Sequence, residues 1–219
     1  MKVKEMMSTD VLTISLDANV NEAFRIMKEK NVRRLPVMNQ GKLVGIITLS
    51  DLNQAAPSAA TSLSIHELNY LLARTKVKDI FPVNQKVVTV SPENYIETAA
   101  KLMLQHQISS LPVMDGEKLV GIITETDLFR ALVDILGVKR AHTRIDTLIP
   151  EGPGSLAEIT GLMASRGINI INTVVYYDAS LDKYKVILRI EELDYEPVVE
   201  ALRAKGFQIE SVIVSKQVD

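Results

Sequence analysis

Apolar residues in the first half of the chain alternate between strand-like runs and helical spacing. Val11 to Ser15 is a short extended run, and the stretch from Val20 to about Lys30 carries apolar side chains at helical spacing. Two β-prone runs follow, Leu35 to Met38 and Leu43 to Thr48, and the turn residues between them favour a hairpin. The pattern therefore predicts a strand, a helix and a β-hairpin, followed by a helix that begins near Asp51.

This pattern occurs twice along the chain. Residues 11–52 align with residues 87–128 at a constant offset of 76, without a gap. The sequence Leu-Pro-Val-Met, at residues 35–38 and 111–114, and the ending Gly-Ile-Ile-Thr-x-x-Asp, at residues 45–51 and 121–127, mark the two copies. We expect two βαββα repeats related by a pseudo-two-fold axis, with ligand-binding clefts between them.

The pattern changes after about residue 141. Strand-like and helical runs then follow the order βαββαβ, which is typical of a ferredoxin-like unit. The predicted strands are Arg144 to Ile149, Ile168 to Tyr177, Tyr184 to Ile190 and Gln208 to Val214, with helices around Leu156 to Met163 and from Tyr195 to Lys205. The whole chain is thus expected to be an α+β protein.

Composition excludes several classes of partner. The 219 residues are 47% hydrophobic and only 5% aromatic, and the apolar runs are far shorter than the roughly 20 residues of a membrane-spanning helix. The 25 Lys and Arg residues are interspersed with 27 Asp and Glu residues, so we expect neither nucleic acid nor a membrane as a partner. Cysteine is absent, which excludes disulfides and thiolate chemistry, and the cytoplasm is the expected location.

The two repeats resemble a tandem pair of CBS domains, a module named after cystathionine β-synthase. The resemblance rests on the paired strands, hairpins and Thr-x-x-Asp endings, each preceded by a related segment at residues 3–7 and 77–81. We assign residues 1–62 to the first repeat and residues 63–136 to the second. The resemblance implies a regulatory module that binds AMP, ADP, ATP or S-adenosylmethionine in clefts between the repeats.

The same resemblance implies which positions contact the adenine ligand. They are Thr13, Arg34, Leu35, Pro36, Thr48, Ser50 and Asp51 in the first repeat, and Thr89, Ser110, Leu111, Pro112, Thr124, Thr126 and Asp127 in the second.

Local chemistry leaves two interpretations of the Thr-x-x-Asp endings. A strand that runs into a helix presents main-chain N–H groups to a phosphate, and a carboxylate three residues later can accept both hydroxyls of a ribose. The same spacing is also a helix-capping box. Charge differs between the copies, because Arg33 and Arg34 correspond to two serines and Leu49 corresponds to Glu125. We expect the first half to hold ligand phosphates better, unless the two arginines are merely solvated.

The C-terminal segment resembles an ACT domain over residues 143–219, after a linker at residues 137–142. The motif Pro-Gly-Ser-Leu-Ala-Glu-Ile at residues 153–159 is followed by Gly-Ile-Asn-Ile at residues 167–170. An ACT domain typically binds an amino acid at a dimer interface, which would involve Gly154, Ser155, Leu156, Asn169 and Ile170. Alternatively, the glycine serves only the turn, and Ser155 with Glu158 is a capping box.

A CBS pair followed by an ACT domain resembles the AcuB-type acetoin-utilisation proteins. We expect a non-catalytic sensor of small-molecule effectors that forms a homodimer or higher oligomer and acts on a partner enzyme, with a role in acetoin or related carbon metabolism. His66, His106 and His142 are scattered, no nucleophile motif occurs, and no metal is required. The alternative is a structural oligomerisation module whose ligand sites are vestigial.

Overall fold

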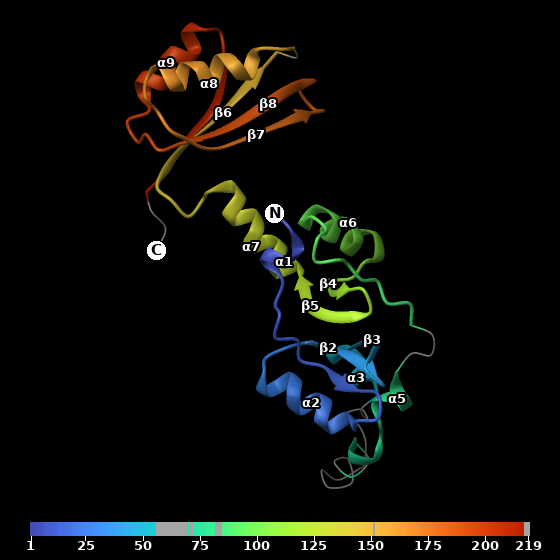
Figure 1. Cartoon of the computed structure of the whole chain (residues 1–219). Coiled ribbons are helices and arrows are strands. Elements are labelled where there is room, and N and C mark those ends of the chain that lie inside the picture. The colour runs from blue at the N-terminus through green and yellow to red at the C-terminus, as the bar shows by residue number, and fades with distance from the viewer. Residues whose placement is uncertain (56–69, 71, 82–84, 151, 217–219) are drawn as a thin grey trace. The chain divides into compact units, whose positions relative to one another are not determined.

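The computed structural model describes residues 1–55, 70, 72–81, 85–150 and 152–216 (Figure 1). The chain divides into two compact units, Met1–Leu128 and Phe129–Asp219, and the division falls inside helix α7 (Glu125–Leu136). The predicted boundary between residues 62 and 63 lies outside the described residues. The remaining predicted domain limits, including the linker at residues 137–142, stay predictions.

The first repeat has the predicted helix and hairpin, whereas its first strand covers only Ile14–Ser15 of the run predicted from Val11 to Ser15. Its elements are α1 (Val3–Met6), β1 (Ile14–Ser15), α2 (Val20–Glu29), β2 (Arg34–Asn39), β3 (Lys42–Thr48) and α3 (Leu49–Ala55). Strand β1 pairs parallel with β2, and β2 pairs antiparallel with β3. The hairpin turns at Gln40 and Gly41, whose φ angles of 48° and 79° suit a type I′ turn. The register of the sheet therefore follows from local turn chemistry.

The second repeat copies this order with one exception. Its elements are α5 (Val77–Ile80), α6 (Ile96–His106), β4 (Ser110–Asp115), β5 (Lys118–Thr124) and α7. The strand predicted from Val87 to Val90 is wrong, because only Val90 forms an isolated bridge, to Val113. Proline explains the difference. In the first repeat, the Leu16 N–H donates to the Met38 carbonyl, whereas the corresponding residue Pro92 has no N–H to donate.

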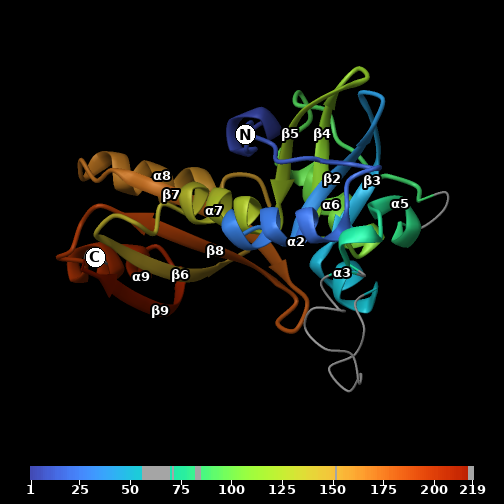
Figure 2. The same cartoon turned by 90° about the horizontal axis from the view of Figure 1, so that it is seen from below.

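The short leading helix of each repeat packs on the other repeat. The Val3 N–H in α1 donates to the Asn94 carbonyl at 2.8 Å, and the Val77 N–H in α5 donates to the Ala18 carbonyl, also at 2.8 Å. The two hairpins lie side by side in both views of the unit (Figures 1 and 2). This reciprocal exchange ties the repeats into one unit with pseudo-two-fold symmetry.

Two glycines allow the exchanged segments to approach the hairpins closely. A Cβ atom on Gly121 in β5 would lie 2.5 Å from Met7 Sδ, and one on Gly45 in β3 would overlap the ring of Phe81. These glycines occupy corresponding positions, 76 residues apart. Glycine is required at both positions for a steric reason, because each glycine faces a side chain from the leading segment of the other repeat.

The core of the first repeat lies between its sheet and its helices. The fully buried side chains Val20 and Ala23 of α2 meet Leu35 and Val37 of β2, together with Leu52 of α3. The first turn of α2 is capped by the Asn19 side chain. The apolar face that the helical spacing predicts is thus the face that packs on the sheet.

The second unit is a four-stranded antiparallel sheet with two helices. After the end of α7 come β6 (His142–Ile149), α8 (Ser155–Ser165), β7 (Ile170–Asp178), β8 (Lys183–Ile190), α9 (Glu196–Ala204) and β9 (Gln208–Ser215). The strand order β7-β8-β6-β9 is that of a ferredoxin-like βαββαβ unit. Both helices cover the same face of the sheet (Figure 1), and the core between them includes Ile145, Ile159 and Leu188.

Within the described residues, no helix combines the length and the apolar character needed to cross a membrane.

Lysine–carboxylate pairs reinforce the exchange of the leading helices. The ammonium groups of Lys2 and Lys4 each lie 2.6 Å from a carboxylate oxygen of Glu93. Lys78 makes the corresponding contact with Asp17 at 2.9 Å. Hydrogen bonds from Lys2 and Lys4 hold the pKa of Glu93 well below its ordinary value of 4.5, at about 2. These pairs are exposed, so each contributes modestly to stability.

Glu93→Gln should lower the thermal unfolding midpoint of the first unit at neutral pH but not in strong acid. A carboxylate whose pKa is depressed on folding stabilises the folded state above its unfolded pKa, and that stabilisation is lost as the pH falls from 4.5 towards 2. The measurement is a series of melting curves for wild type and variant across this window. The double variant Lys2→Gln, Lys4→Gln should show the same convergence, and a difference between wild type and Glu93→Gln that stays constant with pH would contradict the assignment.

Candidate functional site

A cavity of about 640 Å³ lies between the two repeats, and we call it the larger cavity. Both repeats contribute to its wall. The first supplies the segment before β1 and the turn between α2 and β2, and the second supplies the end of β5 and the start of α7. The lining residues are Ser8, Asp10, Val11, Leu12, Asn31, Val32, Arg33, Arg34, Pro36, Ser109, Ser110, Ile122, Thr124, Glu125, Thr126 and Asp127.

A capped carboxylate stands at the start of α7. Asp127 Oδ2 accepts hydrogen bonds from the Thr124 main-chain N–H at 2.9 Å and from the Thr124 hydroxyl at 2.7 Å. Asp127 is 94% buried (relative exposure 6%). Asp51 makes the same contacts with Thr48 at the start of α3, at 2.7 Å each. The capping interpretation of Thr-x-x-Asp therefore holds in both repeats, and Oδ2 of each carboxylate accepts the capping bonds.

The first repeat contributes the positively charged side chains that line the larger cavity. Arg33 and Arg34 follow the end of α2, and the Arg34 guanidinium donates a hydrogen bond to the Ser109 hydroxyl of the second repeat. Three carboxylates, those of Asp10, Glu125 and Asp127, share the lining with these two arginines. Both arginines of the larger cavity come from the first half, and the expectation that this half holds ligand phosphates better stays a prediction.

A second cavity, of about 250 Å³, occupies the pseudo-symmetric position, and we call it the smaller cavity. Its lining residues are Arg34, Ile46, Thr48, Gln85, Lys86, Val87, Val88, Gln107, Ile108, Ser109 and Ser110. Many of these are larger-cavity positions shifted by 76 residues, such as Val87 for Val11 and Ile46 for Ile122. Arg34, Ser109 and Ser110 line both cavities, so the two cavities adjoin.

The edges of the two cavities are closed by different chemical means. Beside the larger cavity, the main chain of Ser8 exchanges two hydrogen bonds with the main chain of Ile122, at 2.9 and 3.0 Å. Beside the smaller cavity, the side-chain amide of Gln85 takes the same role: its Oε1 accepts from the Ile46 N–H at 2.8 Å and its Nε2 donates to the Ile46 carbonyl at 3.2 Å. A side-chain amide here replaces a peptide group.

The structure brings part of the predicted adenine site together. Six predicted residues line the larger cavity, and three line the smaller one, with two residues shared. The larger cavity has Arg34, Pro36, Ser110, Thr124, Thr126 and Asp127, and the smaller has Arg34, Thr48 and Ser110.

The other predicted positions lie outside both linings. Leu35 and Leu111 are completely buried in the core, so only their main-chain groups could reach a ligand. Pro112 is also buried, Asp51 is half-buried, and the remaining three are exposed, namely Thr13, Ser50 and Thr89. A ligand role for these seven residues stays a prediction.

The predicted site omits residues 8–12 of the first repeat and the corresponding residues of the second. Ser8, Asp10 and Leu12 line the larger cavity, and Gln85 and Lys86 line the smaller one. A sequence signal exists for Val11 and Leu12, because they open the aligned repeat as a β-prone pair. Nothing in the linear sequence indicates that this segment faces the opposite hairpin, since that is a tertiary contact.

The residues predicted to bind an amino acid do not meet within one chain. Gly154 precedes α8 with φ of 102°, and the Ser155 hydroxyl at the first position of the helix donates to the Pro150 carbonyl. Leu156 follows in the first turn of α8, whereas Ile170 begins β7 and the Asn169 carbonyl before it accepts from the Glu191 N–H. The eleven residues of α8 separate the two groups by about 16 Å.

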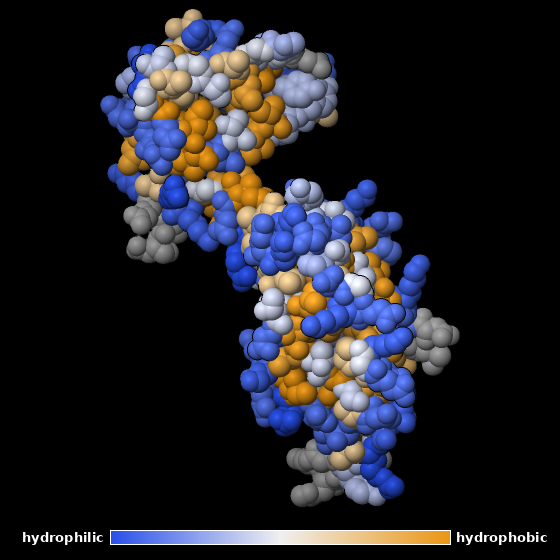
Figure 3. All heavy atoms as spheres, in the orientation of Figure 1, coloured by the Kyte–Doolittle hydropathy of each residue, from blue (hydrophilic) through white to orange (hydrophobic). Residues whose placement is uncertain are grey.

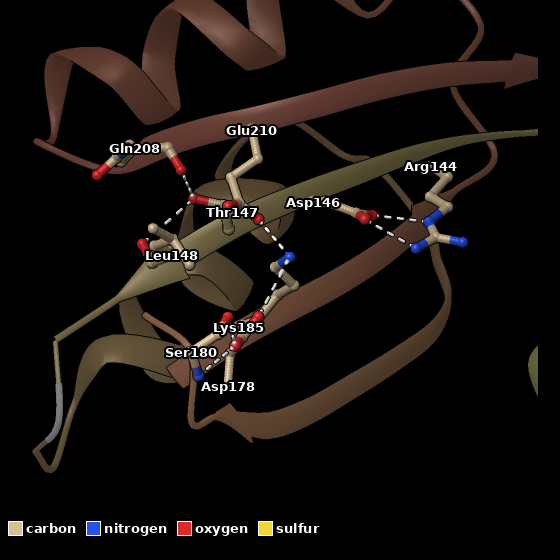
Figure 4. A network of polar contacts seen from close by, with 9 residues as sticks. All are labelled: Arg144, Asp146, Thr147, Leu148, Asp178, Ser180, Lys185, Gln208 and Glu210. Atoms are coloured by element: carbon tan, nitrogen blue, oxygen red, sulfur yellow. Dashed lines mark hydrogen bonds and ion pairs between the residues drawn. The ribbon is translucent and has the colours of Figure 1, made fainter. Parts of the chain in front are cut away.

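A polar network covers the sheet face opposite α8 and α9 (Figure 4). Arg144 donates two hydrogen bonds of 2.7 Å to the Asp146 carboxylate, which raise the pKa of Arg144. Lys185 pairs with Glu210 at 2.7 Å. Burial lowers the pKa of the Arg189 guanidinium, and nearby Arg144 lowers it further. Arg144 and Lys185 are thus paired within the sheet face, whereas Arg189 Nε is buried without a hydrogen-bond partner among the described residues.

The described residues contain no group of three histidine or acidic side chains placed to hold a metal ion.

Comparisons with known proteins relate the first unit to other chains. A model of the CBS domain matches residues 3–58 and 77–134. A CBS domain-containing protein of Bacillus subtilis is 33% identical over 126 residues, which cover 58% of this chain and 81% of that protein. One of Dictyostelium discoideum is 35% identical over 136 residues, with 61% and 92% covered. The crystal structure of AcuB from Vibrio cholerae, a protein named for acetoin utilization, is 28% identical with a TM-score of 0.51, with 63% of this chain and 94% of that chain covered.

Gln85→Ala should accelerate hydrogen exchange of the Ile46 amide. The substitution removes the acceptor of the Ile46 N–H and the donor to its carbonyl, and a net loss of about 1–1.5 kcal/mol corresponds to roughly tenfold faster exchange. Amide exchange followed by NMR measures this directly. The Ile122 amide, held by the main chain of Ser8, is the internal control, and unchanged Ile46 exchange would show that Gln85 does not close this edge in solution.

Proposed function

Because the chain belongs to the family of proteins built from CBS domains, we propose that it is a non-catalytic regulatory sensor whose larger cavity binds an adenine-containing ligand. The observation that carries the proposal is the meeting, in one cavity of about 640 Å³, of the capped Asp127 carboxylate with Arg33 and Arg34 of the opposite repeat. This volume falls in the usual range for small-molecule sites. The ligands we propose are AMP, ADP, ATP and S-adenosylmethionine.

Each part of such a ligand has a matching group in the lining. The Asp127 carboxylate lines the cavity and is the group we expect to accept hydrogen bonds from ribose hydroxyls. Val11, Leu12 and Ile122 offer an apolar wall for the adenine ring. Arg33 lines the same cavity, and we expect it to pair with a phosphate or a carboxylate on the 5′ side of the ligand. Recognition of this kind needs no bond-breaking step, which supports a sensing role.

For the second unit we propose an ACT-type role, with an amino acid bound at a dimer interface. Strands β6 and β7 each pair antiparallel with β8, which lies between them, so β6 and β7 run parallel to each other. The end of β7 at Asp178 therefore lies at the same end of the sheet as Gly154, which follows the end of β6. Antiparallel pairing of β7 with a second copy would bring the partner's strand start to that end. Gly154 of one chain would then face the Asn169 position of the other.

The surface of β7 supports this arrangement. β7 is an edge strand, and its side chains Val175, Tyr176 and Tyr177 are exposed. Hydrophobic surface is visible on the C-terminal unit in Figure 3. An exposed edge strand with apolar and aromatic side chains is a template for pairing with another strand. We therefore propose a homodimer, in which the second copy covers β7 and completes the amino-acid site.

The proposed output is a binding surface offered to a partner enzyme when the cavities are occupied. Similarity to AcuB of Vibrio cholerae supports a place in acetoin or related carbon metabolism. The alternative, an oligomerisation module without ligands, is favoured only by the use of both Thr-x-x-Asp motifs as helix caps.

Asp127→Ala should weaken binding of the adenine ligand about tenfold to a hundredfold, because it removes a charge-assisted contact to the ribose. Isothermal titration with AMP, ADP, ATP and S-adenosylmethionine measures the effect. Asp51→Ala is the matched control, since it removes the same helix cap outside the linings of both cavities. Equal losses in the two variants would assign the effect to the cap, and unchanged affinity in Asp127→Ala would refute the site.

Light scattering should give a dimer mass for the full chain, and Val175→Lys should shift it towards the monomer. In a two-fold antiparallel pairing, residues near the middle of β7 face their own copies, so two lysines would repel each other. Ile213→Lys, on the opposite edge strand β9, is the matched control and should remain dimeric. A monomeric wild type, or a monomer only with Ile213→Lys, would rule out the shared site at β7.

A further inference from the structure

The smaller cavity differs from the larger one in the sign of its charge. Lys86 and Arg34 line it, and among its described lining residues none is acidic. The larger cavity has three carboxylates against two guanidinium groups. Two cations without a carboxylate in the wall create a positive potential that favours an anion.

The contrast arises at corresponding positions of the two repeats. Where the larger cavity has Asp10, the smaller has Lys86, 76 residues later. Glu125, which lines the larger cavity, corresponds to the apolar Leu49. Both replacements make the smaller cavity more positive, so pseudo-symmetry preserves the shape of the framework but not the chemistry of the two sites.

The polar groups of the smaller cavity suit an oxyanion. The Ser109 hydroxyl accepts a hydrogen bond from Arg34, and a hydroxyl that accepts one bond can still donate another. Ser110, which is 97% buried (relative exposure 3%), and the Gln107 side chain add further donor groups to the wall. Phosphate binds best where Arg or Lys acts together with neutral donors.

Size argues against a complete nucleotide in this position. The volume of about 250 Å³ lies below the range of roughly 300–1,000 Å³ typical of sites for drug-sized ligands, whereas the larger cavity lies within it. The side-chain amide of Gln85 helps to close the edge of the smaller cavity by its bonds to Ile46. A compact anion such as a phosphoryl group fits the available space.

We propose that the smaller cavity is a separate oxyanion site that binds a phosphoryl group between Lys86 and Arg34. The group is either free inorganic phosphate or the terminal phosphate of a nucleotide held in the larger cavity, because Arg34, Ser109 and Ser110 line both. The free-phosphate arm is independent of the proposed nucleotide function, whereas the terminal-phosphate arm rests on it.

The test compares the full-length wild type with Lys86→Gln by isothermal titration at low ionic strength in a chloride buffer. Inorganic phosphate is titrated alone, and adenosine, AMP, ADP and ATP are titrated in its absence. Loss of one charge-assisted contact should weaken the affected ligand about tenfold or more. Lys118→Gln, which neutralises an exposed lysine outside both linings, is the matched control, and circular dichroism confirms that both variants fold.

Each outcome decides the proposal. Weaker binding of inorganic phosphate in Lys86→Gln, with adenosine and AMP unaffected, supports an independent oxyanion site. Weaker binding of ADP or ATP alone supports a subsite for the terminal phosphate. If Lys86→Gln matches Lys118→Gln for every ligand, or if neither phosphate nor any nucleotide binds the wild type, the proposal is overturned. If inorganic phosphate binds and no adenine ligand does, the proposed nucleotide function is refuted and the oxyanion site is retained.

Discussion

Reciprocal pairing of each repeat's leading segment with the opposite hairpin is the constraint on which the first unit depends. Ser8 is bonded to Ile122 through the main chain, and Gln85 is bonded to Ile46 through its side chain. Hydrogen bonds to main-chain edges fix position in a way that apolar packing alone does not. The exchange places the segment before β1 opposite the start of α7, and both cavities exist because of it.

Much of the fold could be predicted because its signals are local. Alternating apolar residues and a turn with positive φ at Gln40 and Gly41 specify a hairpin wherever they occur, and helical spacing locates α2 and α8. The missing strand at Val87 to Val90 depends on the absent N–H of Pro92, two residues beyond the run, and on its partner across the sheet. That dependence is non-local.

The candidate site was harder to predict than the fold. Asp127 and Thr124 could be identified from their spacing, because the motif is chemically meaningful wherever it stands. Asp10 and Lys86 carry no motif, and their importance follows only from the cavity that each one faces. Leu35 is among the residues predicted to contact the ligand, but its side chain is buried in the core. It is adjacent in sequence to Arg34 and Pro36, which line the larger cavity, and neighbouring residues of a strand point to opposite faces.

The two edge closures differ in how they respond to mutation. The bridge at Ser8 uses peptide groups that every residue except proline possesses, so its formation is nearly independent of the side chain at that position. The bridge at Gln85 requires one particular amide of one particular length. A single amino-acid substitution at Gln85 can therefore remodel the edge of the smaller cavity, while the main-chain bridge beside the larger cavity is retained. Ligand preference can thus diverge at the smaller cavity while the edge of the larger cavity is unchanged.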